Sequence, residues 1–239
     1  MTSWKTGAML RAAVVVACLS AAVVRAAGEE ATTATTATKV VKKVGAPAAK
    51  EPAAFAKALK TYQAGKFKDS IPLFEEAVKE NPGHAMSLQF LGRANYEAKR
   101  YAEAIGAAKR VAALQPENAR NLRTLGLAQM AANDLKGAVE SLTQAAKADP
   151  RNFWTQNDLG FALFQLGQND DARKALEEAV KIDGAKAMTW NTLGVARLRT
   201  GDRAGAIEAF KKALEIDPNY ARAKASFAAI ESQKATNGK

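Results

Sequence analysis

The sequence predicts an all-α protein built from consecutive pairs of helices. Of its 239 residues, 48% are hydrophobic but only 7% are aromatic, so Ala and the aliphatic residues supply most of the apolar content. Ala has the highest helix propensity, and this composition therefore favours helices. Five dipeptides that end a helix recur with their last residues 34 positions apart: Asn81-Pro82, Gln115-Pro116, Asp149-Pro150, Asp183-Gly184 and Asp217-Pro218. Since proline cannot continue a helix, each dipeptide closes one repeat unit.

Residues 1–26 are expected to be an export signal rather than part of the fold. Lys5 and Arg11 precede an uncharged, mostly apolar run at residues 12–24. This run is shorter than the roughly 20 residues of a membrane-spanning helix. Small or apolar residues then precede a cut after Ala26, as in a cleaved signal peptide. An uncleaved anchor is the alternative.

Cys18 allows a second interpretation of the same segment. Val15-Val16-Ala17-Cys18 resembles the bacterial lipobox, in which the Cys is lipidated and becomes the mature N-terminus. The apolar run before Cys18 is short for that role, and Cys18 is otherwise a small apolar residue of the signal. Residues 27–50 are rich in Ala, Thr and Lys without a helical or strand period. We expect them to be a disordered tether.

From residue 51 the chain divides into five units of 34 residues and a tail. The units are 51–84, 85–118, 119–152, 153–186 and 187–220, and the tail is 221–239. The first predicted helix carries Leu-Gly at Leu91-Gly92, Leu125-Gly126, Leu159-Gly160 and Leu193-Gly194. A glycine inside a helix costs up to ~1 kcal/mol relative to Ala, so its recurrence indicates close helix packing. Breaks after the first helix are predicted at Gly65, Asn133, Gly167 and Gly201. The second helix has small residues at Ser70, Ala104, Ala138, Ala172 and Ala206.

This pattern resembles the tetratricopeptide repeat (TPR), a helix–turn–helix unit of about 34 residues. The fifth unit matches the family pattern almost in full, at Trp190, Leu193-Gly194, Ala206, Phe210, Ala213 and Pro218. The resemblance covers residues 51–220. It implies a right-handed α-solenoid whose first helices line a concave groove, with residues 221–239 as a capping helix and frayed tail.

The resemblance also implies which residues line the groove. We expect Tyr62, Met86, Arg93, Tyr96, Arg120, Arg123, Met130, Trp154, Asn157, Phe161, Phe164, Asn191, Leu198 and Arg199 to form a peptide-binding surface. Phe55, Leu59, Gln89, Leu127, Met188, Val195 and Arg222 occupy further groove positions. The charged members are all Arg, which pairs with carboxylates, so the expected ligand is an amphipathic helix or extended peptide with apolar anchors and acidic flanks. The alternative is that many apolar members pack between neighbouring helices.

Composition excludes several kinds of chemistry. One Cys cannot form an internal disulfide or, with one His, a Cys/His zinc site, and a Ser-His-Asp centre would have to use His84. Residues 1–50 hold 7 Lys+Arg and 2 Asp+Glu, so they supply +5 of the net charge of +11. This weakens the case for nucleic acid as a partner. We therefore expect a protein that is not an enzyme, needs no cofactor or metal, and does not bind nucleic acid.

Together these features predict a non-catalytic protein-binding scaffold or adaptor of a bacterial cell envelope, periplasmic or secreted. Contact with a membrane is expected only through an uncleaved signal or through a lipidated Cys18, which would make the protein a membrane-anchored lipoprotein. The alternatives are an assembly factor for pili or secretion channels, a self-associating solenoid that stacks through its ends, and a non-catalytic partner of a cell-wall enzyme.

Overall fold

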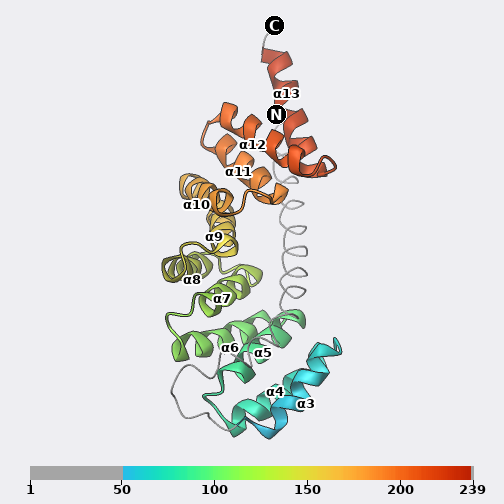
Figure 1. The fold of residues 1–239 in the computed structure, drawn as a ribbon, viewed down its shortest axis with the longest axis vertical. Coiled ribbons are helices and arrows are strands. Elements are labelled where there is room, and N and C mark those ends of the chain that lie inside the picture. The colour runs from blue at the N-terminus through green and yellow to red at the C-terminus, as the bar shows by residue number, and fades with distance from the viewer. Residues whose placement is uncertain (1–50, 238–239) are drawn as a thin grey trace, which may run out of the picture. The chain divides into compact units, whose positions relative to one another are not determined.

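A computed structural model describes residues 51–237, and every regular element in this part of the chain is an α-helix (Figure 1). The helices are α3 (Ala53–Gln63), α4 (Phe67–Glu80), α5 (Ala85–Glu97), α6 (Tyr101–Leu114), α7 (Ala119–Ala131), α8 (Leu135–Ala148), α9 (Phe153–Leu166), α10 (Asn169–Ile182), α11 (Ala187–Arg199), α12 (Arg203–Ile216) and α13 (Ala221–Asn237). The predicted all-α class is confirmed, and each 34-residue unit holds two helices.

The expected signal peptide at residues 1–26, with Cys18, and the expected tether at residues 27–50 lie outside the described residues. Within residues 51–237 we find no helix whose length and apolarity would suffice to cross a bilayer. The longest helix there is α13, with 17 residues.

Three of the turns between units in the described part of the chain end in a residue whose side chain caps the next helix. The side chains of Asn118 and Asn152 accept a hydrogen bond from the backbone N–H three residues later, at the starts of α7 and α9. Such caps satisfy an N–H group that has no partner inside the helix. His84 does the same for α5 through Nδ1, and its ring lies 5.0 Å from that of Phe55. The one His of the sequence is thus a partly buried helix cap.

The turn between the two helices of each unit passes through left-handed backbone. The φ angle is +74° at Gly65, +63° at Asn133, +84° at Gly167 and +86° at Gly201. Gly and Asn adopt this conformation more readily than other residues, and all four are predicted breaks. In the second unit the left-handed residue of this turn is Lys99, whose φ is +62°. No sequence signal marked it, because an exposed Lys is equally compatible with a helix.

Glycine in the first helix permits close contact with the second helix of the same unit. A Cβ atom on Gly126, Gly160 or Gly194 would lie 2.6 Å from a side-chain carbon of that second helix. The opposing side chains are Leu142, Leu176 and Phe210, all fully buried. Gly92 differs because it faces Ala residues of α6, the nearest Cβ being 3.5 Å away. The close helix packing predicted from the Leu-Gly motifs therefore occurs in the third, fourth and fifth units, and the packing at Gly92 in the second unit is looser.

The core runs along the stack as a succession of clusters instead of gathering at one centre. The predicted small residues of the second helices are at most 1% exposed: Ser70, Ala104, Ala138, Ala172 and Ala206. Within residues 51–237 the main contacts of each unit are with its sequence neighbours, which is the architecture of a repeat solenoid.

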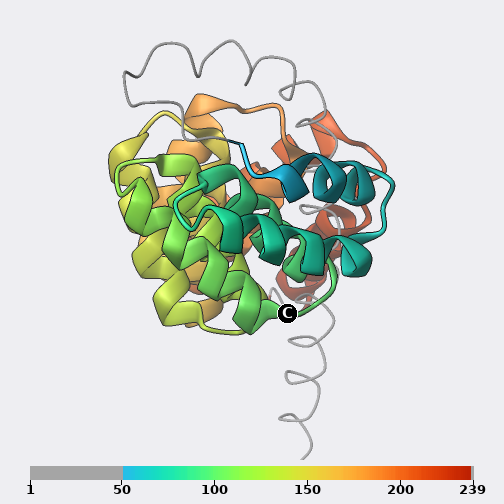
Figure 2. The same cartoon turned by 90° about the horizontal axis from the view of Figure 1, so that it is seen from below.

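The solenoid curves toward its first helices. First helices of neighbouring units contact one another, namely α3 with α5, α7 with α9, and α9 with α11, and α11 also contacts α13. Second helices of neighbouring units make no comparable contact in the described part of the chain. Because units approach more closely on the side of the first helices, these helices line the concave face (Figures 1 and 2).

Candidate functional site

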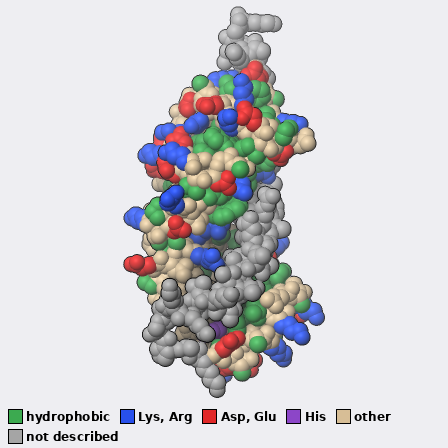
Figure 3. Space-filling view, in the orientation of Figure 1, with side chains coloured by type: hydrophobic (Ala, Val, Ile, Leu, Met, Phe, Trp, Pro, Cys, Tyr) green, Lys and Arg blue, Asp and Glu red, His purple; other side chains and the backbone are tan. Residues whose placement is uncertain are grey.

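An apolar floor covers the concave face over α7, α9 and α11. Its side chains, each partly exposed and packed on one side against the core, are Leu127, Phe161, Phe164, Val195 and Leu198. They recur at two positions of the first helices, so that the same kind of surface continues from unit to unit. Figure 3 shows hydrophobic side chains gathered beside Lys and Arg in the middle of the stack. The apolar floor is suited to burying apolar side chains of a partner.

Four of the expected groove residues are buried. Phe55 is 3% exposed and belongs to the core instead of the groove. Met130 is 7% exposed and packs with Leu142 and Leu159 in the core. The expectation that Met130 lines the groove therefore needs correction, because its flexible side chain fills the space among α7, α8 and α9. Asn157 and Asn191 are only 7% and 9% exposed, so they also offer little surface to a partner.

Polar side chains of neighbouring first helices bond to each other and form what we call the polar ladder. Gln89 Nε2 donates to Asn121 Oδ1 at 2.9 Å, which joins α5 to α7. Thr189 Oγ1 donates to Asn157 Oδ1 at 2.9 Å, which joins α9 to α11. In both pairs the partners lie 32 positions apart in the sequence. These bonds hold neighbouring units together and use polar atoms that a ligand could otherwise bond.

The polar ladder stops at the last unit. The Oδ1 atom of Asn191 is buried and has no hydrogen-bond partner among the described residues. The residue 32 positions later is Ala223, fully buried near the start of α13, and its side chain has no donor. A buried acceptor without a partner costs about 1–3 kcal/mol. The capping helix thus leaves one bond of the ladder unmade.

Arg123 and Asp158 form an ion pair in the middle of the concave face. Arg123 Nε donates to Asp158 Oδ2 at 2.6 Å, and the side chains are 21% and 7% exposed. Burial raises the pKa of the Asp158 carboxyl, and the charge and hydrogen bond of Arg123 only partly oppose this. The Arg123 guanidinium also lies 5.9 Å from the ring centre of Trp154, whose other neighbouring cation is Lys186, at 5.8 Å. Arg123, expected to meet a ligand carboxylate, already holds one of the chain's own.

Asp158 is not among the groove residues expected from the sequence. One Asp within a helix carries no mark of burial, and the residue that pairs with it lies 35 positions earlier. An Asp near the Leu-Gly motif of one unit, with an Arg in the preceding unit, is the signal that could have found it.

The other groove arginines differ in their surroundings. Arg93 lies over the ring of Phe90, 5.3 Å from its centre. Arg120 and Arg199 are exposed and form no ion pair with any residue that the structure describes. Arg120 lies in the first turn of α7, and Arg199 is the last residue of α11. We call Arg120 and Arg199 the rim arginines, since they remain available for an acidic partner.

Aromatic residues occupy the concave positions of the first two units. The ring of Tyr62 lies 5.4 Å from that of Phe90. The ring of Tyr96 lies 5.6 Å from that of Tyr101, and burial raises the pKa of the Tyr96 hydroxyl to about 12. Met86 is 37% exposed and is the most accessible apolar side chain at these positions. These residues extend the apolar character of the face toward the N-terminal end of the solenoid.

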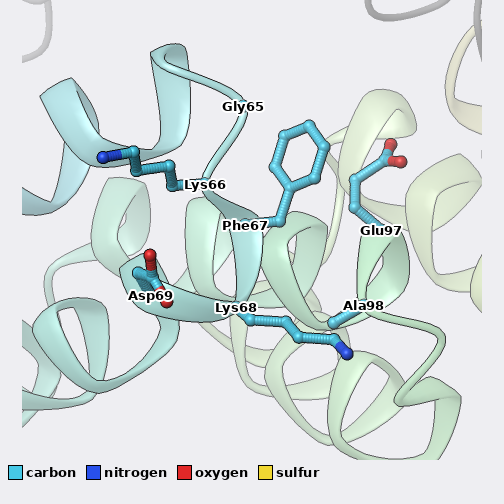
Figure 4. A pocket seen from close by; sticks show the side chains of 7 residues that line it. All are labelled: Gly65, Lys66, Phe67, Lys68, Asp69, Glu97 and Ala98. Atoms are coloured by element: carbon cyan, nitrogen blue, oxygen red, sulfur yellow. The ribbon is translucent and has the colours of Figure 1, made fainter.

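A shallow cavity lies at the edge of the stack, between the α3–α4 turn and the end of α5 (Figure 4). Its volume is about 280 Å³, and it is lined by Gly65, Lys66, Phe67, Lys68, Asp69, Glu97 and Ala98. Burial raises the pKa of the Glu97 carboxyl. Its lining comes from α4, the turn before it and the end of α5, so the cavity does not include the apolar floor of α7, α9 and α11.

Comparison with known families identifies the repeat. Tetratricopeptide-repeat models match residues 55–119, 129–188 and 187–220, which together exceed half of the chain. The chain belongs to the tetratricopeptide-repeat family. Proteins of this family are generally non-catalytic, and the fold supports a scaffold for protein–protein interaction.

Solved structures include several with the same fold. The crystal structure of MamA shares 24% sequence identity with a TM-score of 0.65, and the match covers 71% of this chain and 92% of MamA. A second neighbour is YrrB, a TPR protein with an unusual peptide-binding site. Its sequence identity with this chain is 19% and the TM-score is 0.65, and the match covers 80% of this chain and 96% of YrrB. TTC0263, a thermophilic TPR protein of Thermus thermophilus, shares 23% sequence identity with a TM-score of 0.54. The match covers 75% of this chain and 98% of TTC0263. At these identities the likeness establishes the fold alone. No curated protein sequence matches the chain.

Proposed function

We propose that this TPR protein is a non-catalytic adaptor that captures a peptide or helix of a partner protein on its concave face. The observation that carries the proposal is the partly exposed apolar floor on α7, α9 and α11, the outer two of which carry the rim arginines. Apolar side chains of a partner would be buried against the floor, and acidic residues at the flanks would pair with Arg120 and Arg199.

Two further points support this proposal. YrrB, a neighbour in fold, is a TPR protein with an unusual peptide-binding site. The inner ion pair between Arg123 and Asp158 neutralises the middle of the face, while the rim arginines stay unpaired with described residues. A partner with an apolar centre and acidic flanks matches that order of apolar and charged surface.

The proposal includes a place in a bacterial cell envelope, periplasmic or secreted. Its support is the signal-like composition of residues 1–26 followed by the tether-like residues 27–50. A lipidated Cys18 would instead hold the protein at a membrane. Mass spectrometry of the mature protein from its native host distinguishes a chain that begins at Ala27 from one that begins at a lipid-modified Cys18, and an intact Met1 would contradict both forms of processing.

Photocrosslinking in the native host tests the capture of a partner. Trp154 is replaced by a photoreactive amino acid, and the matched control carries it at Lys136, which is exposed on the second helix α8. We expect a protein adduct from position 154 that is absent from position 136. The adduct should be lost when Arg120 and Arg199 are both changed to Glu, because charge reversal at the rim repels acidic flanks. Adducts that persist in this folded double variant would contradict the proposal.

A further inference from the structure

We infer that the occupant of the concave face is an amphipathic α-helix with an acidic residue near each end, and not an extended strand. The inference rests on the proposed function, since it specifies the form of the ligand that the same surface takes. It comes from one juxtaposition, namely an apolar floor beside polar side chains that mostly bond within the protein already, although the buried Oδ1 of Asn191 has no partner among the described residues.

An extended ligand needs hydrogen-bond partners on the protein, because each of its residues carries an N–H and a C=O that cost free energy when buried unpaired. The polar side chains of the first helices offer few such partners. Gln89 and Asn157 belong to the polar ladder. The hydroxyls of Thr124 and Thr192 donate to carbonyl oxygens of their own helices at 2.9 Å. Arg123 is held by the carboxylate of Asp158.

The backbone of the concave face offers no partners either. α7, α9 and α11 bond their N–H and C=O groups internally along most of their length, so the floor has no open strand edge to which a peptide could add. A helical ligand has no such need, because its own backbone bonds stay intact while one apolar face is buried. The floor therefore fits a helix at a lower cost in unmade hydrogen bonds than it fits a strand.

Size and charge define the helix further. Packed helices lie about 10 Å apart, so the floor from α7 to α11 is about 20 Å long. A helix rises about 1.5 Å per residue, and about 14 residues would cover this length. Arg120 lies in the first turn of α7 and Arg199 is the last residue of α11, so the rim arginines mark diagonally opposite corners of the floor, and their long side chains can reach inward over it. An acidic residue near each end of the ligand helix would meet them.

Selection from two display libraries of equal diversity tests the inference on the full chain. The first library randomises one face of a 14-residue helix held on a rigid helical scaffold. The second presents 14 residues with proline at every third position, which prevents a helix and favours an extended chain. We expect binders from the helical library only, with apolar residues at i, i+3, i+4 and i+7 and acidic residues near both ends. A proline placed in the middle of a selected helix should weaken its binding at least tenfold.

Variants of the protein show where the selected binders dock. Arg120→Glu should weaken the selected helices at least tenfold, and the fold should tolerate it because Arg120 is exposed. The matched control Lys136→Glu, on the second helix α8, should change affinity less than twofold. Extended binders that depend on Arg120 would overturn the helical occupant and leave the proposed groove function standing. Helical binders that ignore Arg120→Glu dock elsewhere and also overturn the inference. If neither library yields Arg120-dependent binders, the proposed function fails with it.

Discussion

Gly160 of α9 lies directly against Leu176 of α10, so that a Cβ atom on Gly160 would be 2.6 Å from the Leu176 Cγ and 3.2 Å from the carbonyl oxygen of Ala172. We expect Gly160→Ala to lower the free energy of unfolding by about 1–2 kcal/mol, because overpacking costs more than the gain in helix propensity. Chemical denaturation followed by circular dichroism measures the change.

Gly92→Ala is the matched control for this prediction. Gly92 occupies the same place in the second unit, but the nearest Cβ atom to the added methyl group is 3.5 Å away, which is an ordinary contact. The free energy of unfolding should stay unchanged or rise by up to ~1 kcal/mol from the higher helix propensity of Ala. Equal effects at both glycines would show that the opposing residue of the second helix does not decide the outcome.

Lys99 holds a left-handed backbone conformation at a φ of +62°. Residues other than Gly lose about 1–2 kcal/mol in this conformation. We expect Lys99→Gly to relieve this strain and to raise the free energy of unfolding by about 1 kcal/mol. The net gain is smaller than the strain relieved, because glycine has greater conformational freedom in the unfolded chain. The neighbouring Ala98, with a φ of −76°, provides the control, since Ala98→Gly relieves no strain and should destabilise the protein. Thermal or urea unfolding of both variants decides the point, and a loss of stability in Lys99→Gly would contradict it.

Ala223 leaves the buried Oδ1 of Asn191 without a hydrogen-bond partner. In the preceding unit Thr189 donates to Asn157 from the position 34 residues before Ala223. We expect Ala223→Thr to complete the polar ladder and to raise the free energy of unfolding by about 1 kcal/mol. Ala223→Val has the same shape without the hydroxyl and should give no such gain. If both variants have the same free energy of unfolding, the unpaired Oδ1 of Asn191 does not limit the stability of the C-terminal end of the solenoid.

Asp158 should make stability depend on pH. Burial raises its pKa above the ordinary value of 3.8, so the folded protein holds this proton at pH values where the unfolded chain has released it. This contribution is fully present below pH 3.8 and is lost as the pH rises through the folded pKa. Asp158→Asn removes the titration. The difference in unfolding free energy between the variant and the original protein should therefore shift in favour of the variant as the pH rises above about 4.

Urea denaturation of both proteins from pH 3 to pH 7 measures this difference directly. Other carboxyl groups are common to the two chains, so their titration cancels in the comparison. A difference that shifts against Asp158→Asn with rising pH would mean that the attraction of Arg123 outweighs the cost of burial. Such a result would reverse the direction of the pKa shift.

The fold was predictable because its signals are local. The Leu-Gly motifs, the closing dipeptides and the residues at four of the turns each act within one unit, and their repetition at 34 positions made each unit support the interpretation of the next. The left-handed turn at Lys99 was not predicted, because lysine is not a residue type that distinguishes a turn from a helix. The relaxed packing at Gly92 was not predicted either, because it depends on the small residues of the facing helix α6.

The sequence by itself determined the repeat and its period, since helix propensity and apolar spacing reside in short segments, and the resemblance to the tetratricopeptide repeat implied that the first helices line the concave side. Only the tertiary structure decided which concave residues are free. Met130 is withdrawn into the core, Asn157 is bonded to Thr189, and Arg123 is neutralised by Asp158. The polar partners lie 32 and 35 positions away in a neighbouring unit. Curvature brings adjacent first helices together. Polar groups that the sequence pattern suggests are free for a ligand are therefore bonded to the neighbouring helix.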